Sequence, residues 1–208
     1  MTGGESARRD SGTLEPPADA GAIQAGLAAI ARHDPGFSAR TLTTWATAAV
    51  ELIGQSLTSG DATPARTIMA NGLYRTHHAL LELRAQAQVW CEGSWHATGA
   101  TVVHAASTSL FDEVRVRLRC QGWCWEWHEP TGLTLRGSPE STCWSEDLTF
   151  GRPADAISPV AGALPTSRCP SCGAPLNLDP DGTCRHCQGV ITAGRDDWVL
   201  VAWQREPR

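Results

Sequence analysis

The sequence predicts an α+β fold, and three observations support this. Apolar residues recur at helical spacing between residues 20 and 88. From residue 101 to residue 150 the apolar period changes to two, which is typical of strands. Two CxxC pairs then precede a last apolar segment at 198–204. Helices followed by a run of strands indicate an α+β domain, with a small cysteine-rich unit inserted before the final strand.

Length, net charge and the distribution of apolar residues argue against several classes of protein. The chain has 208 residues and a formal net charge of −5, enough for one domain and a small appendage. Its acidic balance argues against a general nucleic-acid surface. Its apolar runs fall short of the roughly 18 residues that a membrane span needs. Residues 1–10 lack the apolar centre of a signal peptide. We therefore expect a cytoplasmic protein without a transmembrane segment.

Composition and the predicted elements divide the chain into four parts. Residues 1–19 are rich in Gly, Ser, Pro and charge, and we expect them to be disordered. Residues 20–155 hold the helices and most of the strands. Residues 156–195 hold a linker and the cysteine-rich unit, and residues 196–205 supply the final strand.

Proline, glycine and capping residues set the predicted helix boundaries. A proline ends the first helix, because the residue before proline disfavours the helical conformation. A serine is a predicted N-cap, and a Thr-Pro pair is a predicted helix start. The predicted helix ends are at His33-Asp34-Pro35-Gly36, Ser59-Gly60 and Asn71-Gly72, the last of which ends a short helix. The predicted helix starts are at Ser38 and Thr63-Pro64, and the last predicted helix runs from Leu73 towards Gln88.

The clearest predicted strand runs over residues 112–128, and it contains a parity problem. Its apolar residues are even-numbered up to Cys120, whereas Trp123, Trp125 and Trp127 are odd-numbered. A bulge at Gln121-Gly122 would bring the tryptophans onto the apolar face, and a hairpin there is the alternative. Further strands are expected at 101–106, 133–136, 144–150 and 198–204. The last is apolar on both faces, so we expect it inside the sheet.

The two CxxC pairs predict a zinc site. Cys169 and Cys172 are followed, after eleven residues, by Cys184 and Cys187. Four thiolates complete a closed tetrahedral shell, so one Zn²⁺ should be structural. Gly173 follows the second sulfur, where such a turn often needs a left-handed residue. Two redox-active dithiols are the alternative, although the surrounding pattern does not favour them.

A second group of thiols does not fit a metal site. Cys120, Cys124 and His128 lie four apart on one predicted strand, hence roughly 13 Å from one another. Ligands of one zinc must be within about 4 Å of each other. We therefore interpret these cysteines, and Cys143, as buried or half-buried thiols.

Five residues are candidates for lining a cavity: Tyr74, Glu146, Trp123, Trp125 and Trp127. Glu146 shares parity with Trp144 and Leu148, so it should face inwards and could act as a base. The favoured alternative is an ion pair with Arg136 or Arg152. For the tryptophans, packing in the core is favoured over ligand or nucleic-acid stacking.

Several motifs together resemble bacterial Tim-forty-four-like domains, named for the mitochondrial import-motor tether. They are Ala29–Ser38, Leu73-Tyr74, Val114–Leu118, Arg136-Gly137, Glu146–Arg152 and Asp197–Leu200. The resemblance implies a nuclear-transport-factor-2-like cone, in which a bent sheet wraps around helices and leaves an apolar cavity. It also implies that a zinc ribbon can precede the last strand and that peripheral membrane contact is conceivable. Leu148 stands where tryptophan is common in the family.

These observations favour a non-enzymatic binding or scaffold protein that contacts a protein partner or an apolar ligand. An enzyme using acid–base chemistry in the cavity is one alternative. Nucleic-acid binding through the zinc unit is another, with Arg168, Arg185 and Arg195 in its favour. The fold class cannot choose among them, because such folds host many functions.

Overall fold

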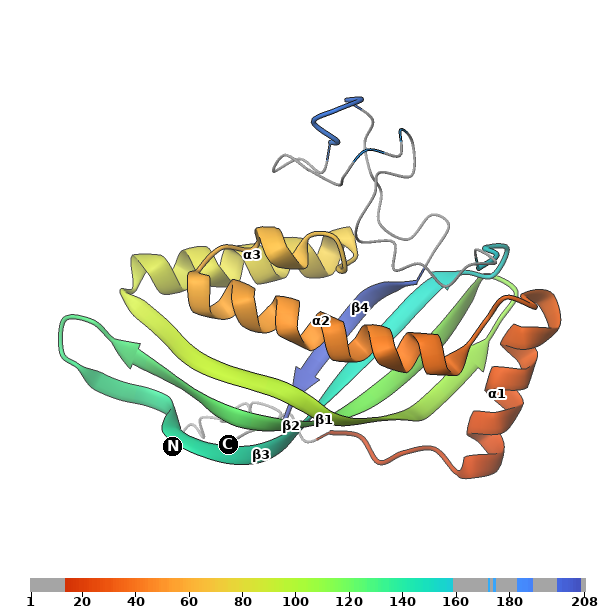
Figure 1. The fold of residues 1–208 in the computed structure, drawn as a ribbon, viewed down its shortest axis with the longest axis horizontal. Helices are drawn as coiled ribbons and strands as arrows, with labels where there is room; N and C mark the ends of the chain where they lie inside the picture. Colours follow the sequence, from red (N-terminus) through yellow and green to blue (C-terminus); the bar gives the residue numbers. More distant parts are fainter. Residues whose placement is uncertain (1–13, 159–171, 173, 175–182, 189–197, 207–208) are drawn as a thin grey trace, which may run out of the picture.

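The fold is α+β: helices pack on one side of a four-stranded antiparallel sheet (Figure 1). The computed structural model describes residues 14–158, 172, 174, 183–188 and 198–206. The helical elements are α1 (Ala20–His33), α2 (Ala39–Ser59), the 3-10 helix η1 (Thr63–Ala65) and α3 (Asn71–Gln86). The strands are β1 (Val89–Ser107), β2 (Phe111–His128), β3 (Leu133–Pro153) and β4 (Val199–Arg205). None of the helices described is long and apolar enough to cross a membrane.

Local capping chemistry sets the helix ends much as expected. α1 ends at His33, directly before the Asp34-Pro35 pair. The Ser38 side chain accepts a hydrogen bond from the Thr41 N–H and so caps α2. Gly60, with φ 71°, ends α2 in the left-handed conformation that glycine adopts without strain. Two expectations were wrong: Asn71 begins α3 and does not end the preceding helix, and Thr63 is the first residue of η1 and not its N-cap.

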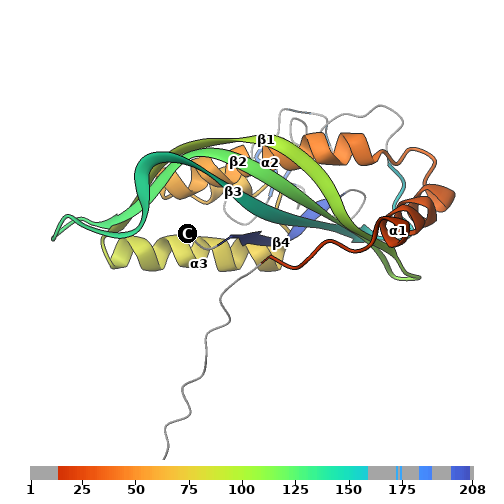
Figure 2. The ribbon, with the colours of Figure 1, turned by 90° about the horizontal axis from the view of Figure 1, so that it is seen from below.

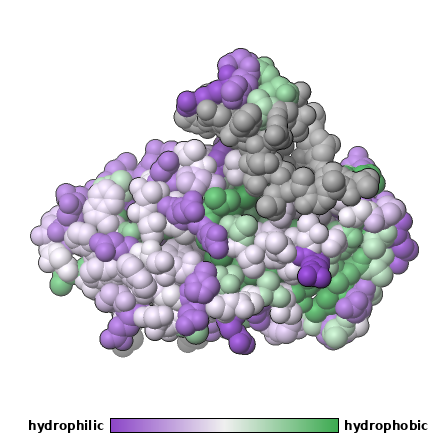
Figure 3. Space-filling view, viewed as in Figure 1, coloured by the Kyte–Doolittle hydropathy of each residue, from purple (hydrophilic) through white to green (hydrophobic). Residues whose placement is uncertain are grey.

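The strands are long and bent, and α2 lies along their concave side (Figures 1 and 2). The core is formed between this helix and the sheet. Val50 and Ile53 of α2 and Val116, Leu118 and Leu148 of the sheet are all completely buried. On the face shown in the space-filling view, hydrophobic residues gather near the centre and towards the right, with hydrophilic residues around them (Figure 3).

The final strand lies at an edge of the sheet, and the expectation that it would lie inside was wrong. The strand order is β1-β2-β3-β4. A short segment covers the outer edge of β4: Leu200 donates to the Ile68 carbonyl at 2.8 Å and accepts from the Ala70 N–H at 2.9 Å. The edge is thus paired over this stretch, and Leu200 is completely buried although β4 is the last strand of the sheet.

The tryptophan-rich end of β2 keeps its parity, which differs from the expected shift. β1 and β2 pair without interruption from Val89↔His128 to Ala97↔Cys120. Cys124 therefore stays on the buried face with Cys120. An irregularity does occur between Gly122 and Cys124, but the extra residues are in the partner strand β3. β3 is one continuous strand where the sequence predicted two.

Candidate functional site

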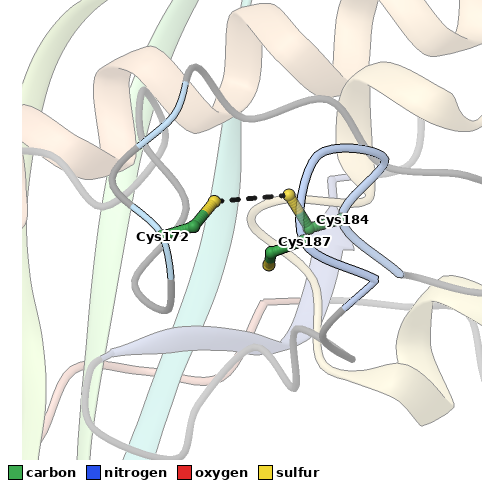
Figure 4. A group of neighbouring side chains, drawn as sticks. All are labelled: Cys172, Cys184 and Cys187. Atoms are coloured by element: carbon green, nitrogen blue, oxygen red, sulfur yellow. Dashed lines mark hydrogen bonds between the residues drawn. The ribbon is translucent and has the colours of Figure 1, made fainter.

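Three of the four predicted zinc ligands lie close together. The sulfurs of Cys172, Cys184 and Cys187 are all within 4.8 Å of one another. Figure 4 shows the Cys172 and Cys184 sulfurs directed at each other, and they are 3.9 Å apart. Ligands of a tetrahedral zinc with bonds of about 2.3 Å are separated by nearly this distance. These thiols can hold a metal ion. The fourth predicted ligand, Cys169, lies outside the described residues.

The second CxxC pair is held by a tight turn. The Gln188 N–H donates to the Cys184 carbonyl at 2.8 Å and closes the turn. Gln188 directly follows Cys187 and has φ 58°, a left-handed conformation. In the first pair the sequence predicted such a residue at Gly173, which lies outside the described residues. Cys184 is buried, whereas Cys172, Cys187 and His186 are exposed.

Glu146 is completely buried, and both of its carboxylate oxygens accept hydrogen bonds. Oε1 accepts from the Trp144 indole at 2.7 Å and from Nε of Arg205 at 2.8 Å. Oε2 accepts from the Trp203 indole at 2.7 Å. The favoured interpretation, an ion pair, agrees with this geometry, but the partner is Arg205 and not Arg136 or Arg152.

Arg205 is enclosed by aromatic rings. Its guanidinium carbon lies 4.7 Å from the Trp95 ring centroid, 5.2 Å from that of Trp144 and 5.9 Å from that of Trp203. Burial opposes the charge on Arg205, but the nearby Glu146 carboxylate outweighs it, so the pKa of Arg205 is raised. Cation–π contacts of this kind stabilise a guanidinium that has lost water.

Among the other candidate cavity residues, Trp125 lines a small pocket together with Arg205, whereas Tyr74, Trp123 and Trp127 do not line it. Tyr74, on α3, is in contact with Arg66, whose guanidinium lies 4.8 Å from the ring centroid. Trp123, Trp125 and Trp127 are half-buried, and by strand parity they lie on the opposite face from Cys124. The rings of Trp125 and Trp127 stack at 6.2 Å. The structure thus gives Glu146 a set of neighbours different from the predicted one.

A second buried ion cluster was missed at the sequence level. Arg152 binds Asp34 at 2.8 Å and Asp112 at 3.1 Å, and all three side chains are fully buried. His33 lies 2.9 Å from Asp112, and the Ser158 hydroxyl donates to Asp34 at 2.6 Å. Burial opposes ionisation of Asp34, but its hydrogen bonds with Ser158 and Arg152 outweigh it and lower its pKa. The cluster ties the end of α1 to β2 and β3.

A small pocket of about 20 Å³ lies beside the Glu146–Arg205 pair. Its lining residues are Cys124, Trp125, Glu126, Arg136, Gly137 and Arg205. Cys124 also approaches Cys91 of β1, with the two sulfurs 3.6 Å apart. No sequence signal singled out Cys91, because its partner is 33 residues away in the chain.

Comparison with models of known protein families gave no match. Comparison with curated proteins gave no match either.

Proposed function

We propose that this chain is a non-enzymatic binding or scaffold protein with a Tim-forty-four-like domain. In this proposal a zinc ribbon is inserted between β3 and β4, and it contacts a protein partner. The observation that carries the proposal is the group of three thiols within 4.8 Å of one another, at the CxxC spacing. Four thiolates leave no coordination position for a substrate, so the metal would stabilise a surface and take no part in a reaction.

The contacts of Glu146 support a binding role over acid–base catalysis. This carboxylate accepts hydrogen bonds from two indoles and a guanidinium. A general base must lie within reach of a substrate proton, whereas the Glu146 side chain is completely buried. Glu146 instead joins β3 to β4 and anchors the strand that follows the cysteine-rich unit.

The contact between two of the quoted motifs agrees with their belonging to one domain. Asp34 belongs to the motif at Ala29–Ser38, and Arg152 belongs to the motif at Glu146–Arg152. In the fold these residues form one buried ion pair. Residues that appeared unrelated along the chain therefore serve one structural purpose, as expected for motifs of a single domain.

Zinc content tests the metal part of the proposal. We expect about one zinc per chain in protein purified without added metal. Cys187→Ser should lose most of the zinc, because three thiolates no longer close the shell. Cys143→Ser, which removes an exposed cysteine of β3, is the matched control and should keep the wild-type content. The proposal is wrong if the wild-type protein holds less than half an equivalent of zinc and the thiols of Cys169, Cys172, Cys184 and Cys187 are all reactive.

Hydrogen exchange with and without a chelator tests whether the zinc unit is a separate module. Metal binding energy should fold mainly the unit that holds the ligands. We expect chelation to remove protection from residues 183–188 and to leave Val114–Leu118 protected. If Val114–Leu118 loses protection at the same time, the domain itself depends on zinc and the modular proposal is wrong.

A further inference from the structure

Two thiols on neighbouring strands are placed to react with each other. Cys91 of β1 and Cys124 of β2 are each 6% exposed, and their sulfurs are 3.6 Å apart. Cys91 pairs with Glu126 and Cys124 pairs with Gly93, so the two cysteines are diagonal neighbours on one face of the sheet. A disulfide needs sulfurs about 2.05 Å apart, and side-chain rotation has to supply the remaining approach.

The surroundings of Cys124 leave no room for neighbouring side chains. A Cβ on Gly93 would lie 3.1 Å from the Cys124 Cα. A Cβ on Gly137 would lie 2.1 Å from the Cys124 carbonyl oxygen, and Gly137 has φ 76°. Both strands that flank Cys124 thus approach it with a glycine. The backbones of both neighbouring strands therefore lie in close contact with the Cys124 backbone, and Gly137 also lines the adjoining pocket.

The Cys124 sulfur lies next to a positively charged side chain and a pocket large enough for a small ligand. Nη1 of Arg205 lies 3.6 Å from the Cys124 Sγ, and Arg136 also lines the pocket. A nearby guanidinium favours the thiolate, which is the reactive form of cysteine. Nη2 of Arg205 is buried and has no acceptor among the described residues. A volume of about 20 Å³ holds one or two water-sized groups.

We propose that Cys124 is an oxidation site for small hydroperoxides such as hydrogen peroxide, and that Cys91 resolves the product to a disulfide. In the first step the Cys124 thiolate attacks one peroxide oxygen. The S–O bond forms, the O–O bond breaks, and hydroxide leaves and takes up a proton to become water. The sulfur is oxidised to a sulfenic acid and the peroxide is reduced.

In the second step the Cys91 sulfur attacks the sulfenic sulfur of Cys124. The S–S bond forms, the S–O bond breaks, and the departing hydroxide takes the Cys91 proton to give water. The contact with Cys124, together with burial, raises the pKa of the Cys91 thiol. Geometry assigns the two roles: Cys124, which contacts Arg205 and lines the pocket, is the first sulfur to react, and Cys91 then attacks the sulfenic acid.

Peptide mapping of the zinc-loaded full chain after hydrogen peroxide treatment tests the proposal. Trypsin separates the two cysteines, because Arg115, Arg117 and Arg119 lie between them. We expect a Cys91–Cys124 linked peptide as the main product of the domain. Cys120 and Cys124 lie on the same tryptic peptide, and fragment ions show which of the two is linked to Cys91.

Variants separate the two steps. Cys91→Ser should trap the sulfenic acid at Cys124, which dimedone then labels. Cys124→Ser should leave Cys91 unoxidised, and Cys143→Ser should form the disulfide at the wild-type rate. The double variant Glu146→Gln/Arg205→Gln removes both charges of the pair. It should slow oxidation of Cys124 at pH 7 by about tenfold, as expected for a thiol pKa raised by about one unit.

The proposal is overturned if Cys91 and Cys124 both remain alkylatable while the exposed Cys143 is oxidised. It is also overturned if the linked peptide forms only after the protein is unfolded in denaturant. If a variant fails to fold, the wild-type rates decide: Cys124 must be oxidised faster than Cys143 in the same sample.

Discussion

Replacement of Glu146 by glutamine is the sharpest test of the structure. The substitution keeps the shape of the side chain but removes its charge and one of its two acceptor oxygens. Arg205, only 16% exposed, then lacks its anion, and the new amide N–H₂ faces either the Trp203 indole or the Arg205 guanidinium. In the first orientation the Trp203 indole N–H loses its acceptor, and in the second the Trp144 indole N–H and the Arg205 Nε–H both lose theirs.

The size of the effect follows from burial. Removing one partner of a buried ion pair costs about 3–5 kcal/mol. The lower end applies here, because three tryptophan rings still contact the Arg205 guanidinium and each such contact contributes about 0.5–2 kcal/mol. We therefore expect a loss of about 3 kcal/mol in unfolding free energy, which lowers the Tm by roughly 6–12 °C in a protein of this size.

Thermal and urea unfolding would measure the loss, with Glu126→Gln as the matched control. Glu126 pairs with Arg84 at 2.6 Å, but both side chains are about one-fifth exposed. This pair should contribute less than the Glu146–Arg205 pair, because water reaches the Glu126 carboxylate whereas Glu146 is completely buried. The double variant Glu146→Gln/Arg205→Met should recover much of the stability, because no uncompensated charge remains. If Glu146→Gln costs no more than Glu126→Gln, the assignment of Glu146 as a buried structural anion is refuted.

Two further predictions concern protonation and backbone geometry. Burial lowers the pKa of His77, whose ring lies 2.6 Å from the Ser56 hydroxyl. The unfolded chain therefore binds a proton more readily than the folded protein. The free energy of unfolding should fall as the pH drops below about 6.5, the pKa of histidine in the unfolded chain. Melting at pH 7.5 and 5.5 checks this, and His77→Gln should remove that part of the pH dependence. Gly137→Ala should destabilise the fold by about 1–3 kcal/mol, because its φ is positive and its Cβ would strike the Cys124 carbonyl. Gly132→Ala, also at positive φ but with open space around it, should cost less in the same unfolding assay; equal losses would show that the contact with Cys124 is unimportant.

Local sequence signals were enough to predict several of the helix ends and the alternation of the strands. The end of α1 before Pro35, the Ser38 cap and the Gly60 termination of α2 each depend on residues within four positions of one another. The alternation in Val114–Leu118 also depends only on strand geometry. The CxxC spacing predicted which thiols gather, and three of them do lie together. Such signals are readable because the physical interaction acts over a few residues of chain.

Contacts between residues far apart in the chain became visible only in the folded structure. Glu146 and Arg205 are 59 residues apart, and Cys91 and Cys124 are 33 apart. Their contacts require the order and register of whole strands, which no local pattern specifies. The position of β4 at the sheet edge has the same origin, because its outer edge is paired by residues 68–70. Since one step of register moves a side chain to the opposite face of a sheet, the partner of a buried charge or thiol is decided by strand pairing and not by its neighbours in the chain.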